Sequence, residues 1–388
     1  MRIRLATYST KPRGGVVHAL HLGEALAERG HDVELWALSA DGARFYRPPG
    51  VPAHLVPVER REDEAVEDRI LRYAAVLAGA LREAGEADVH HAEDCLSASS
   101  FLQLRAEGRV PAVVRTVHHV DVFAQSVLEE CQRASIQDVD HRVCVSRFWA
   151  ERLQAEFGVA ADVVPNGVDA GRFDSGLDRA EAGRRMGWGD RRAILTVGGV
   201  EPRKGSRTLL EAFARARGRL GDGALLVVAG GETLFDYADY RAAWREDADR
   251  LDLRVHDGPR PAADADVAVL GTVADPDMAA LYRAADALAL PSTREGFGLA
   301  VLEALAAGLP AVVSDLPVFR EHLEDGRDCL MTPVGDSGPL AAALVRAMHD
   351  EVLRGRLRAG GGATAGRYTW AAAAEAHERV YGRIVGAG

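Results

Sequence analysis

The length, composition and charge of this chain exclude several classes of protein. A sequence of 388 residues is longer than one hydrophobic core usually organises, which predicts two domains. Hydrophobic residues make up 47% and charged residues 27%, a composition typical of an ordered globular protein. The formal net charge of −11 repels polyanions, and no basic stripe interrupts the sequence, so nucleic acid is not expected as a partner.

The cysteines and the apolar segments bear on metal binding and location. The four cysteines lie far apart and form no C-x-x-C spacing, so neither a structural zinc site nor a disulfide framework is expected. The N-terminus lacks the charged region, long apolar stretch and cleavage site of a signal peptide. No apolar run reaches the roughly 18 residues that a membrane span needs. The sequence therefore predicts a cytoplasmic protein.

In the first half of the chain, short apolar runs alternate with longer Ala-, Leu- and Arg-rich helical patterns. This alternation is typical of βαβ units around a parallel sheet. The expected strands cover residues 3–8, 33–38, 87–90, 113–117, 142–145 and 162–164. The expected helices cover residues 16–29, 65–83, 95–107 and 147–157.

A second series of the same kind follows the polar stretch 169–190. Its expected strands cover residues 193–197, 224–229, 267–270, 287–291 and 311–314, and its expected helices cover 206–220, 275–283 and 299–307. The sequence thus predicts an α/β fold with two Rossmann-like, doubly wound parallel-sheet domains, residues 1–172 and 173–388. The pattern leaves open whether a last helix, at about 369–385, packs on its own domain or back on the first.

The strongest local signal is the sequence Glu-Gly-Phe-Gly-Leu-Ala-Val-Leu-Glu from Glu295 to Glu303, which follows a short strand and opens a helix. At about 1.5 Å of rise per residue, the two carboxylates lie roughly 12 Å apart, which suits a ligand with hydroxyl groups at both ends and phosphates between. The N–H groups of Gly298 and Leu299 at the helix start would receive negative charge. The competing interpretation is a helix with two ordinary acids, but Glu303 stands alone in an apolar helix, which favours a ligand partner.

A second signal is the sequence Val-Gly-Gly-Val-Glu-Pro-Arg-Lys-Gly at residues 197–205, directly after the first strand of the second series. Arg203 offers a bidentate fork and Lys204 a point charge, so together they suit a diphosphate. A solvated surface pair is the competing interpretation. Because ligands of doubly wound sheets bind at the carboxyl ends of strands, this loop and the Glu295 loop are expected at the same edge.

Two weaker signals lie in the first half. Gly15 belongs to a glycine turn after the first strand that lacks G-x-G-x-x-G spacing, so a nicotinamide cofactor is not supported. The glycine either permits a tight turn or lets a ligand approach the backbone across an interdomain cleft. His118 and His119 end another strand, where adjacent side chains point to opposite faces, so no metal site is expected. A structural hydrogen bond is the plain interpretation of His118, and its strand-end position favours a ligand contact.

In this order along the chain, the motifs resemble those of the retaining GT-B glycosyltransferases of family 4, also called glycosyl transferases group 1. The resemblance covers essentially the whole chain. It rests on six elements, namely residues 14–15, His118, and the stretches 164–169, 201–205, 271–273 and 295–303. Residues 7–20 further resemble a bacterial subgroup of unknown acceptor.

The resemblance implies roles for individual residues in holding a nucleotide-sugar donor. In the second domain, Lys204 with Arg203 would hold the pyrophosphate and Glu303 the ribose hydroxyls. Contacts to the sugar, the distal phosphate and the base would come from Glu295, from the backbone at Phe297, Gly298 and Leu299, and from the backbone near Val273. In the first domain, His118 would contact the sugar and Gly15 would let the chain pass close to the diphosphate. Many relatives have an Arg where this chain has Gly199, and Arg203 is the candidate to replace its charge.

The activity that the resemblance implies is hexosyl transfer with retention of anomeric configuration, by a front-face mechanism that needs no metal and no cofactor. The catalytic candidates are His118, Lys204 and Glu295. The donor is expected to be a GDP- or UDP-sugar and the acceptor a small molecule or a lipid, with peripheral membrane contact left open. The alternatives are a nucleotide-sugar epimerase of GT-B fold and a non-catalytic nucleotide-sugar-binding protein.

Overall fold

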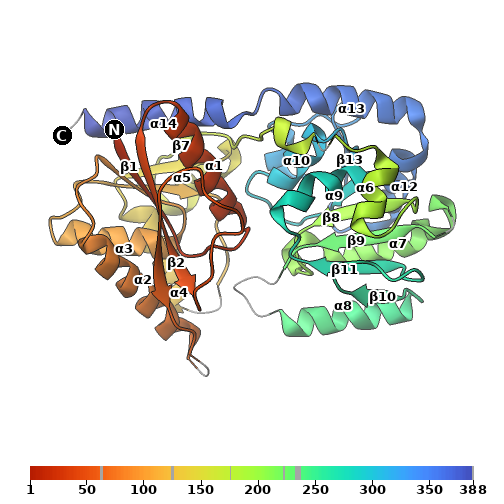
Figure 1. Cartoon of the computed structure of the whole chain (residues 1–388), viewed down its shortest axis with the longest axis horizontal. Coiled ribbons are helices and arrows are strands. Elements are labelled where there is room, and N and C mark those ends of the chain that lie inside the picture. The colour runs from red at the N-terminus through yellow and green to blue at the C-terminus, as the bar shows by residue number, and fades with distance from the viewer. Residues whose placement is uncertain (62–63, 124–125, 175, 222, 232–236, 387–388) are drawn as a thin grey trace. The chain divides into compact units, whose positions relative to one another are not determined.

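In the computed structural model, the chain divides into two compact units. Unit 1 comprises Met1–Gly167 together with Trp370–Gly388, and unit 2 comprises Val168–Thr369. The structure describes residues 1–61, 64–123, 126–174, 176–221, 223–231 and 237–386. Each unit is a parallel sheet with helices packed on its faces (Figure 1).

Unit 1 contains, among its described residues, a seven-stranded parallel sheet in the order β3-β2-β1-β4-β5-β6-β7. The strands are β1 (Arg2–Thr7), β2 (Asp32–Ala40), β3 (Ala53–Val58), β4 (Val89–Ala92), β5 (Val113–Val117), β6 (His141–Cys144) and β7 (Asp162–Val163). The central strands β4 and β5 are buried along their whole length. Their buried histidines and Arg115 show that strands covered on both faces can carry polar side chains here, provided that these find hydrogen-bond partners, as His91 does with Tyr381.

The helices of unit 1 are α1 (Gly14–Glu28), α2 (Val66–Arg82), α3 (Cys95–Ala106), α4 (Ser126–Gln137), α5 (Arg147–Phe157) and α14 (Trp370–Val385). The last of these comes from the C-terminal end of the chain and packs against α1 and β4. The hydroxyl of Tyr381 on α14 lies 2.6 Å from Nδ1 of His91 on β4, and both side chains are fully buried. The final helix is therefore part of the core of unit 1.

Unit 2 repeats the arrangement, and its described residues form a seven-stranded parallel sheet in the order β10-β11-β9-β8-β12-β13-β14. The strands are β8 (Ala193–Val197), β9 (Leu225–Ala229), β10 (Val255–Asp257), β11 (Val267–Gly271), β12 (Ala287–Leu290), β13 (Ala311–Ser314) and β14 (Leu330–Thr332). The α-helices are α6 (Arg179–Met186), α7 (Ser206–Leu220), α8 (Ala238–Arg250), α9 (Met278–Ala284), α10 (Leu299–Ala306), α11 (Pro317–Arg320), α12 (Ser337–His349) and α13 (Glu351–Ala365). Three short 3₁₀ turns add η1 (Gly171–Phe173), η2 (Pro202–Lys204) and η3 (Asp275–Asp277).

Each sheet has one point at which the strand order reverses. In unit 1 the chain runs outward from β1 to β3 and then returns to place β4 on the other side of β1. In unit 2 the same reversal separates β8 from β12. In open α/β sheets the crevice at such a switch point, outside the carboxyl ends of the strands, is where ligands bind.

The predicted fold class is confirmed in both units, with differences in detail. No strand was expected between residues 39 and 86, but β3 lies there, an edge strand whose first three side chains are exposed. The fourth strand was predicted at 87–90 and lies at Val89–Ala92, which moves Glu93 to its carboxyl end. The sequence patterns also missed α4, α6, α8, α11, α12 and α13 and the strands β10 and β14. α8 is rich in charged residues and α13 in glycines, which obscures their apolar faces.

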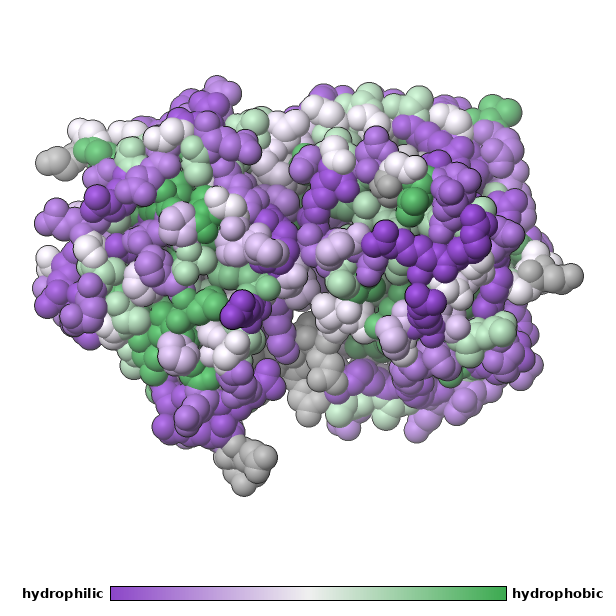
Figure 2. Space-filling model, in the orientation of Figure 1, coloured by the Kyte–Doolittle hydropathy of each residue, from purple (hydrophilic) through white to green (hydrophobic). Residues whose placement is uncertain are grey.

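Hydrophilic residues predominate on the face that Figure 2 shows, with smaller groups of hydrophobic ones between them. Among the described residues of unit 1, the large hydrophobic side chains exposed at the surface include Leu55, Leu71 and Val122. Within the same described ranges, every helix falls short of the length or apolarity that crossing a membrane requires.

Candidate active site

Two loops meet at the switch point of unit 2. The loop after β8 ends in Lys204, and the loop after β12 carries Glu295. Nζ of Lys204 lies 2.8 Å from Oε1 of Glu295, and the guanidinium of Arg203 lies 3.5 Å from Oε2. The ion pair thus joins the carboxyl ends of the two strands that flank the reversal in strand order.

Glu295 is held as a carboxylate in this position. Its side chain is only 8% exposed, and Ser292 donates a hydrogen bond of 2.7 Å to Oε1. Burial works to raise the pKa of Glu295, but the charges of Lys204 and Arg203 outweigh it and bring the pKa down to about 2. The group is therefore an anion at any physiological pH.

Glycines let the two loops approach each other. Gly205 has φ of +65°, and a Cβ placed there would lie 2.0 Å from the carbonyl oxygen of Pro291. The N–H of Thr293 donates to the carbonyl of Arg203 at 2.8 Å, so a backbone hydrogen bond also joins the loops. A Cβ at Gly198 would lie 2.9 Å from Cε of Lys204. The aliphatic part of the Lys204 side chain therefore packs directly on Gly198, where a larger residue would push it away.

The start of α10 follows directly after Glu295. Gly298 is its N-cap, with φ of +96°, and no side chain caps the helix start. A Cβ on Gly298 would lie 2.5 Å from the ring of Phe319. The Phe297 ring is buried and stacks on His322 at a centroid distance of 4.5 Å, so this stretch offers its backbone rather than side chains. Uncapped N–H groups at a helix start bind anions.

Glu303 lies farther along α10 in a separate set of contacts. It accepts a hydrogen bond of 2.6 Å from the hydroxyl of Tyr282. Burial raises the pKa of Glu303, while that hydrogen bond and the charge of Arg172 act against the rise. Arg172 in turn pairs with Asp275. The structure brings Lys204, Arg203 and Glu295 into direct contact, whereas Glu303 binds Tyr282 instead.

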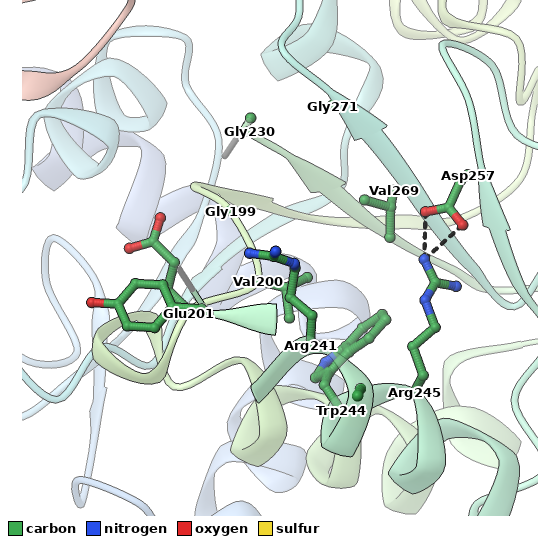
Figure 3. Close-up of a pocket in the computed structure, with 13 residues that line it drawn as sticks. Gly199, Val200, Glu201, Gly230, Arg241, Trp244, Arg245, Asp257, Val269 and Gly271 are labelled. Atoms are coloured by element: carbon green, nitrogen blue, oxygen red, sulfur yellow. Dashed lines mark hydrogen bonds and ion pairs between the residues drawn. The ribbon is translucent and has the colours of Figure 1, made fainter. Parts of the chain in front are cut away.

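A cavity of about 410 Å³ opens beside the Lys204 loop (Figure 3). Its lining comes from the carboxyl ends of β8, β9 and β11 and from α8, and includes Gly199, Glu201, Gly230, Gly231, Arg241, Arg245, Asp257 and Gly271. The guanidinium of Arg245 contacts both carboxylate oxygens of Asp257 at 2.6 Å. Val273, which was expected near the base, lies two residues beyond the lining residue Gly271.

The glycine at position 199 has a local explanation. A Cβ there would lie 2.7 Å from the carbonyl oxygen of Gly231 and 3.1 Å from Oε1 of Glu201. The turns after β8 and β9 are thus in contact, and a longer side chain at Gly199 would force them apart. Arg203 directs its charge toward Glu295 and toward Glu201, 3.6 Å away.

At the switch point of unit 1, two histidine side chains contact one carboxylate, that of Glu93. Glu93 follows β4, His118 follows β5, and His18 lies on α1. Nδ1 of His18 and Nε2 of His118 lie 2.9 and 3.0 Å from the same oxygen, Oε2 of Glu93. A Cβ on Gly15 would lie 3.4 Å from Nε2 of His118, so Gly15 and His118 are neighbours. Among the described residues, these three side chains are also the set whose ligand atoms could hold a metal ion, since they lie within 4.8 Å of one another.

The sequence patterns missed Glu93 and the arginines and aspartate that line the cavity. Glu93 was overlooked because its strand was expected to end three residues earlier. The composition of the chain contains a signal for Lys204, namely the scarcity of lysine. Of the 47 basic residues only Lys11 and Lys204 are lysines, and they lie in the first strand-to-helix turns of unit 1 and unit 2. A chain that otherwise uses arginine has kept an ammonium group at the switch point.

Comparison with known proteins agrees with this geometry. Residues 12–172 match the family model described as "Glycosyltransferase Family 4". Residues 191–350 match the family model described as "Glycosyl transferases group 1". The phosphatidyl-myo-inositol mannosyltransferase of Mycobacterium tuberculosis (strain ATCC 25618 / H37Rv) is 32% identical to this chain over 406 aligned residues. The alignment covers 100% of this chain and 98% of that protein.

Solved structures show the same fold at lower sequence identity. Sucrose-phosphate synthase from Thermosynechococcus elongatus superposes with a TM-score of 0.81 at 20% identity and full coverage of both chains. The Anabaena protein Alr3699/HepE in complex with UDP-glucose superposes with a TM-score of 0.78 at 18% identity, covering 98% of this chain and 99% of that one.

Two parallel-sheet units of this kind have the GT-B fold. The chain belongs to glycosyltransferase family 4. It is a transferase that takes its sugar from a nucleotide-sugar donor, so the enzyme class and the family expected from the sequence are confirmed.

Proposed function

We propose that this enzyme transfers a hexose from a nucleotide diphosphate sugar to a hydroxyl acceptor with retention of anomeric configuration and without a metal ion. The observation that carries the proposal is the Lys204–Glu295 pair at the ends of β8 and β12. An ammonium and a guanidinium contact Glu295 there, and an uncapped helix begins four residues after it, so the segment supplies the cations and free N–H groups that stabilise a leaving diphosphate.

The chemistry follows from these groups. The bond between the anomeric carbon and the diphosphate oxygen breaks while Lys204, Arg203 and the N–H groups at the start of α10 stabilise the growing negative charge. The acceptor oxygen attacks from the same face, and its proton passes to the departing phosphate oxygen. Glu295 orients Lys204 and contacts the sugar. Since the protein's cations stabilise the leaving group, no divalent ion is required.

The remaining contacts to the donor follow from neighbouring positions. Glu303 accepts from the ribose hydroxyls, and the cavity between Gly199 and Gly271 receives the nucleoside, with the backbone near Val273 at the base. The sequence leaves GDP and UDP both open. His118, with Gly15 beside it, contacts the sugar from unit 1.

For the acceptor, the name of the mycobacterial relative favours a lipid with a polyol phosphate headgroup, and it favours mannose as the transferred sugar. The exposed Leu55, Leu71 and Val122 of unit 1 fit a peripheral contact with a membrane surface. A small soluble polyol is the other acceptor that this proposal admits.

The proposal is tested in two steps. A thermal-unfolding panel with GDP, UDP and ADP should single out one nucleotide, because a ligand at 100 times its Kd stabilises the folded state by about 2.7 kcal/mol. The matching mannose or glucose donor is then incubated with phosphatidylinositol vesicles or free inositol in EDTA, and the product anomer is assigned by NMR. Retention in EDTA supports the proposal. Inversion, an absolute need for a divalent ion, epimerised donor, or binding without donor turnover would each contradict it.

Glu303 gives a second prediction. Glu303→Gln keeps the shape of the side chain but removes the charge that strengthens a hydrogen bond from a ribose hydroxyl. Hydrogen bonds to charged groups contribute about 1.5–3 kcal/mol, so KM for the donor should rise by roughly 10- to 100-fold while kcat changes less. Initial-rate kinetics check this, with Glu324→Gln as a control because Glu324 is exposed and pairs with Arg327. An unchanged KM would remove Glu303 from the donor site.

A further inference from the structure

Glu93 is a buried carboxylate at the switch point of unit 1. Its side chain has no exposed surface, and among the described residues no lysine or arginine pairs with it. Its ionisable neighbours are His18, His118, His91 and Tyr381. Burial acts to raise the pKa of Glu93, but the imidazoles of His18 and His118 outweigh it and hold the pKa well below its ordinary value. Glu93 is therefore an anion, and its negative charge is stabilised by N–H groups of the histidines.

Both imidazoles must donate to this anion. Nδ1 of His18 and Nε2 of His118 lie within 3.0 Å of Oε2, and a carboxylate can only accept. A neutral imidazole has a single N–H, so the hydrogen bond fixes which nitrogen carries the proton. For His118, Nε2 carries it and Nδ1 is left with a lone pair.

The second histidine, His18, is held in place by the aromatic rings packed around it. Its ring meets the rings of His118, Trp370 and His377 at centroid distances of 5.0, 5.6 and 5.8 Å. The side chain is 1% exposed, whereas that of His118 is 17% exposed. The buried His18 therefore fixes the Glu93 carboxylate in the interior of unit 1, and His118 is the member of the cluster that reaches the surface.

We propose that Glu93 is a positioning residue that locks His118 as the Nε2–H tautomer, so that its Nδ1 accepts a hydrogen bond from a hydroxyl of the transferred sugar. The proposal rests on the proposed function only in naming the sugar. A hydroxyl donates to a bare ring nitrogen but accepts from an N–H, so the tautomer of His118 decides the direction of the hydrogen bond and which of its two roles the sugar hydroxyl takes.

A metal ion is the competing explanation of the same three side chains. The second oxygen of Glu93, Oε1, is buried and has no hydrogen-bond partner within the part of the chain that the structure describes, which would suit an ion, but both nitrogens contact the other oxygen at hydrogen-bond length. A carboxylate that accepts two N–H groups on one oxygen satisfies both imidazoles without an ion. We therefore favour the hydrogen-bonded arrangement, and metal analysis belongs to the test.

The tautomer can be measured without any substrate. Protein labelled with ¹⁵N-histidine gives separate long-range ¹H–¹⁵N signals for protonated and bare ring nitrogens, and loss of one signal set in His118→Gln assigns the residue. At pH 7.5 we expect His118 with Nε2 protonated and Nδ1 bare. Glu93→Gln retains an accepting oxygen and should preserve this signature, whereas Glu93→Met removes both oxygens and should shift the signals toward a mixture of tautomers.

Kinetics provide the second readout. Glu93→Met should lower kcat by about 10- to 100-fold, the loss expected when one partner of a buried hydrogen bond is removed, and Glu93→Gln should recover most of it. Far-UV circular dichroism of each variant reports that both units are folded, and nucleotide diphosphate binding to unit 2, followed by thermal shift, should not change in either variant. The NMR result stands even where glycosyl transfer fails, which separates this proposal from the proposed function.

Three results would overturn the inference. The first is a wild-type His118 that carries its proton on Nδ1. The second is a folded Glu93→Met protein with wild-type kcat and an unchanged His118 signature. The third is one equivalent of zinc in the purified protein, measured by elemental analysis and lost in His18→Gln and Glu93→Gln, because the cluster would then serve as a metal site.

Discussion

Lys204→Ala is expected to reduce kcat/KM by about 10²- to 10³-fold, the range seen when one preorganised group that stabilises transition-state charge is removed. Its ammonium is half-buried, with the side chain 14% exposed, and lies 2.8 Å from Glu295. Without it, the leaving diphosphate would face an uncompensated carboxylate. Steady-state kinetics with the donor identified by thermal shift are the measurement.

Two variants make the Lys204 result interpretable. Lys204→Arg keeps the charge but replaces a compact ammonium with a planar fork, so we expect only partial recovery. Arg215→Ala removes one positive charge from the exposed surface of α7 and should leave kcat/KM within twofold of the wild type. If Lys204→Ala and Arg215→Ala behaved alike, the diphosphate would have to bind elsewhere.

Gly205→Ala is expected to destabilise the protein and to abolish transfer. The added Cβ would lie 2.0 Å from the backbone oxygen of Pro291, at a residue with φ of +65°. Strain in this region and overpacking together cost on the order of 2–5 kcal/mol, which corresponds to a fall in Tm on the order of 10 °C. Because the Lys204 and Glu295 loops must separate, activity should fall even at temperatures where the variant stays folded.

Gly218→Ala is the matched control on the same helix. Gly218 lies inside α7 (Ser206–Leu220), and a Cβ there would meet no atom within 4 Å. Alanine favours a helix interior by about 1 kcal/mol over glycine, so Tm should rise by about 2–4 °C with unchanged kinetics. Calorimetry and donor assays distinguish the two variants. A Gly205→Ala protein as stable and active as wild type would show that the loops need not touch.

The alternation of strands and helices could be predicted because buried parallel strands carry an unmistakable pattern. β12 is apolar at every position, β5 is buried at every position, and both lie where the sequence predicted them. The loops that hold Lys204 and Glu295 could be placed for the same reason, since each follows such a strand. Their ion pair could not be derived, because it depends on the order of strands across the sheet.

Other elements are invisible in the sequence because tertiary contacts override local propensity. The helix α13 (Glu351–Ala365) contains three consecutive glycines, which by propensity argue against a helix. A Cβ at Gly360 would lie 2.2 Å from the carbonyl oxygen of Arg327, and one at Gly361 would lie 2.7 Å from Leu305. The glycines are there so that α13 can lie close to α10, a reason that appears only when both are in place.

The histidines show the same limit. The pair at His118 and His119 was recognised as a strand end, and its alternating geometry argued against a metal. His118 contacts His18 and Glu93 from two further segments, and His18 in turn contacts Trp370 from a third. No spacing along one stretch of sequence reveals such a convergence.

The discontinuous make-up of unit 1 sets the order in which the enzyme can mature on the ribosome. Met1–Gly167 emerges first, but α14 is translated only after all of Val168–Thr369, a delay on the order of 10–40 s at about 5–20 residues per second. Until then His91 lacks Tyr381 and His18 lacks Trp370, so the histidine cluster lies on a sheet whose seven strands are complete but which α14 does not yet cover. All residues of unit 2 are thus translated before the last helix of unit 1. The release of α14 from the ribosome is the step that completes the packing around the histidine cluster that contains His118.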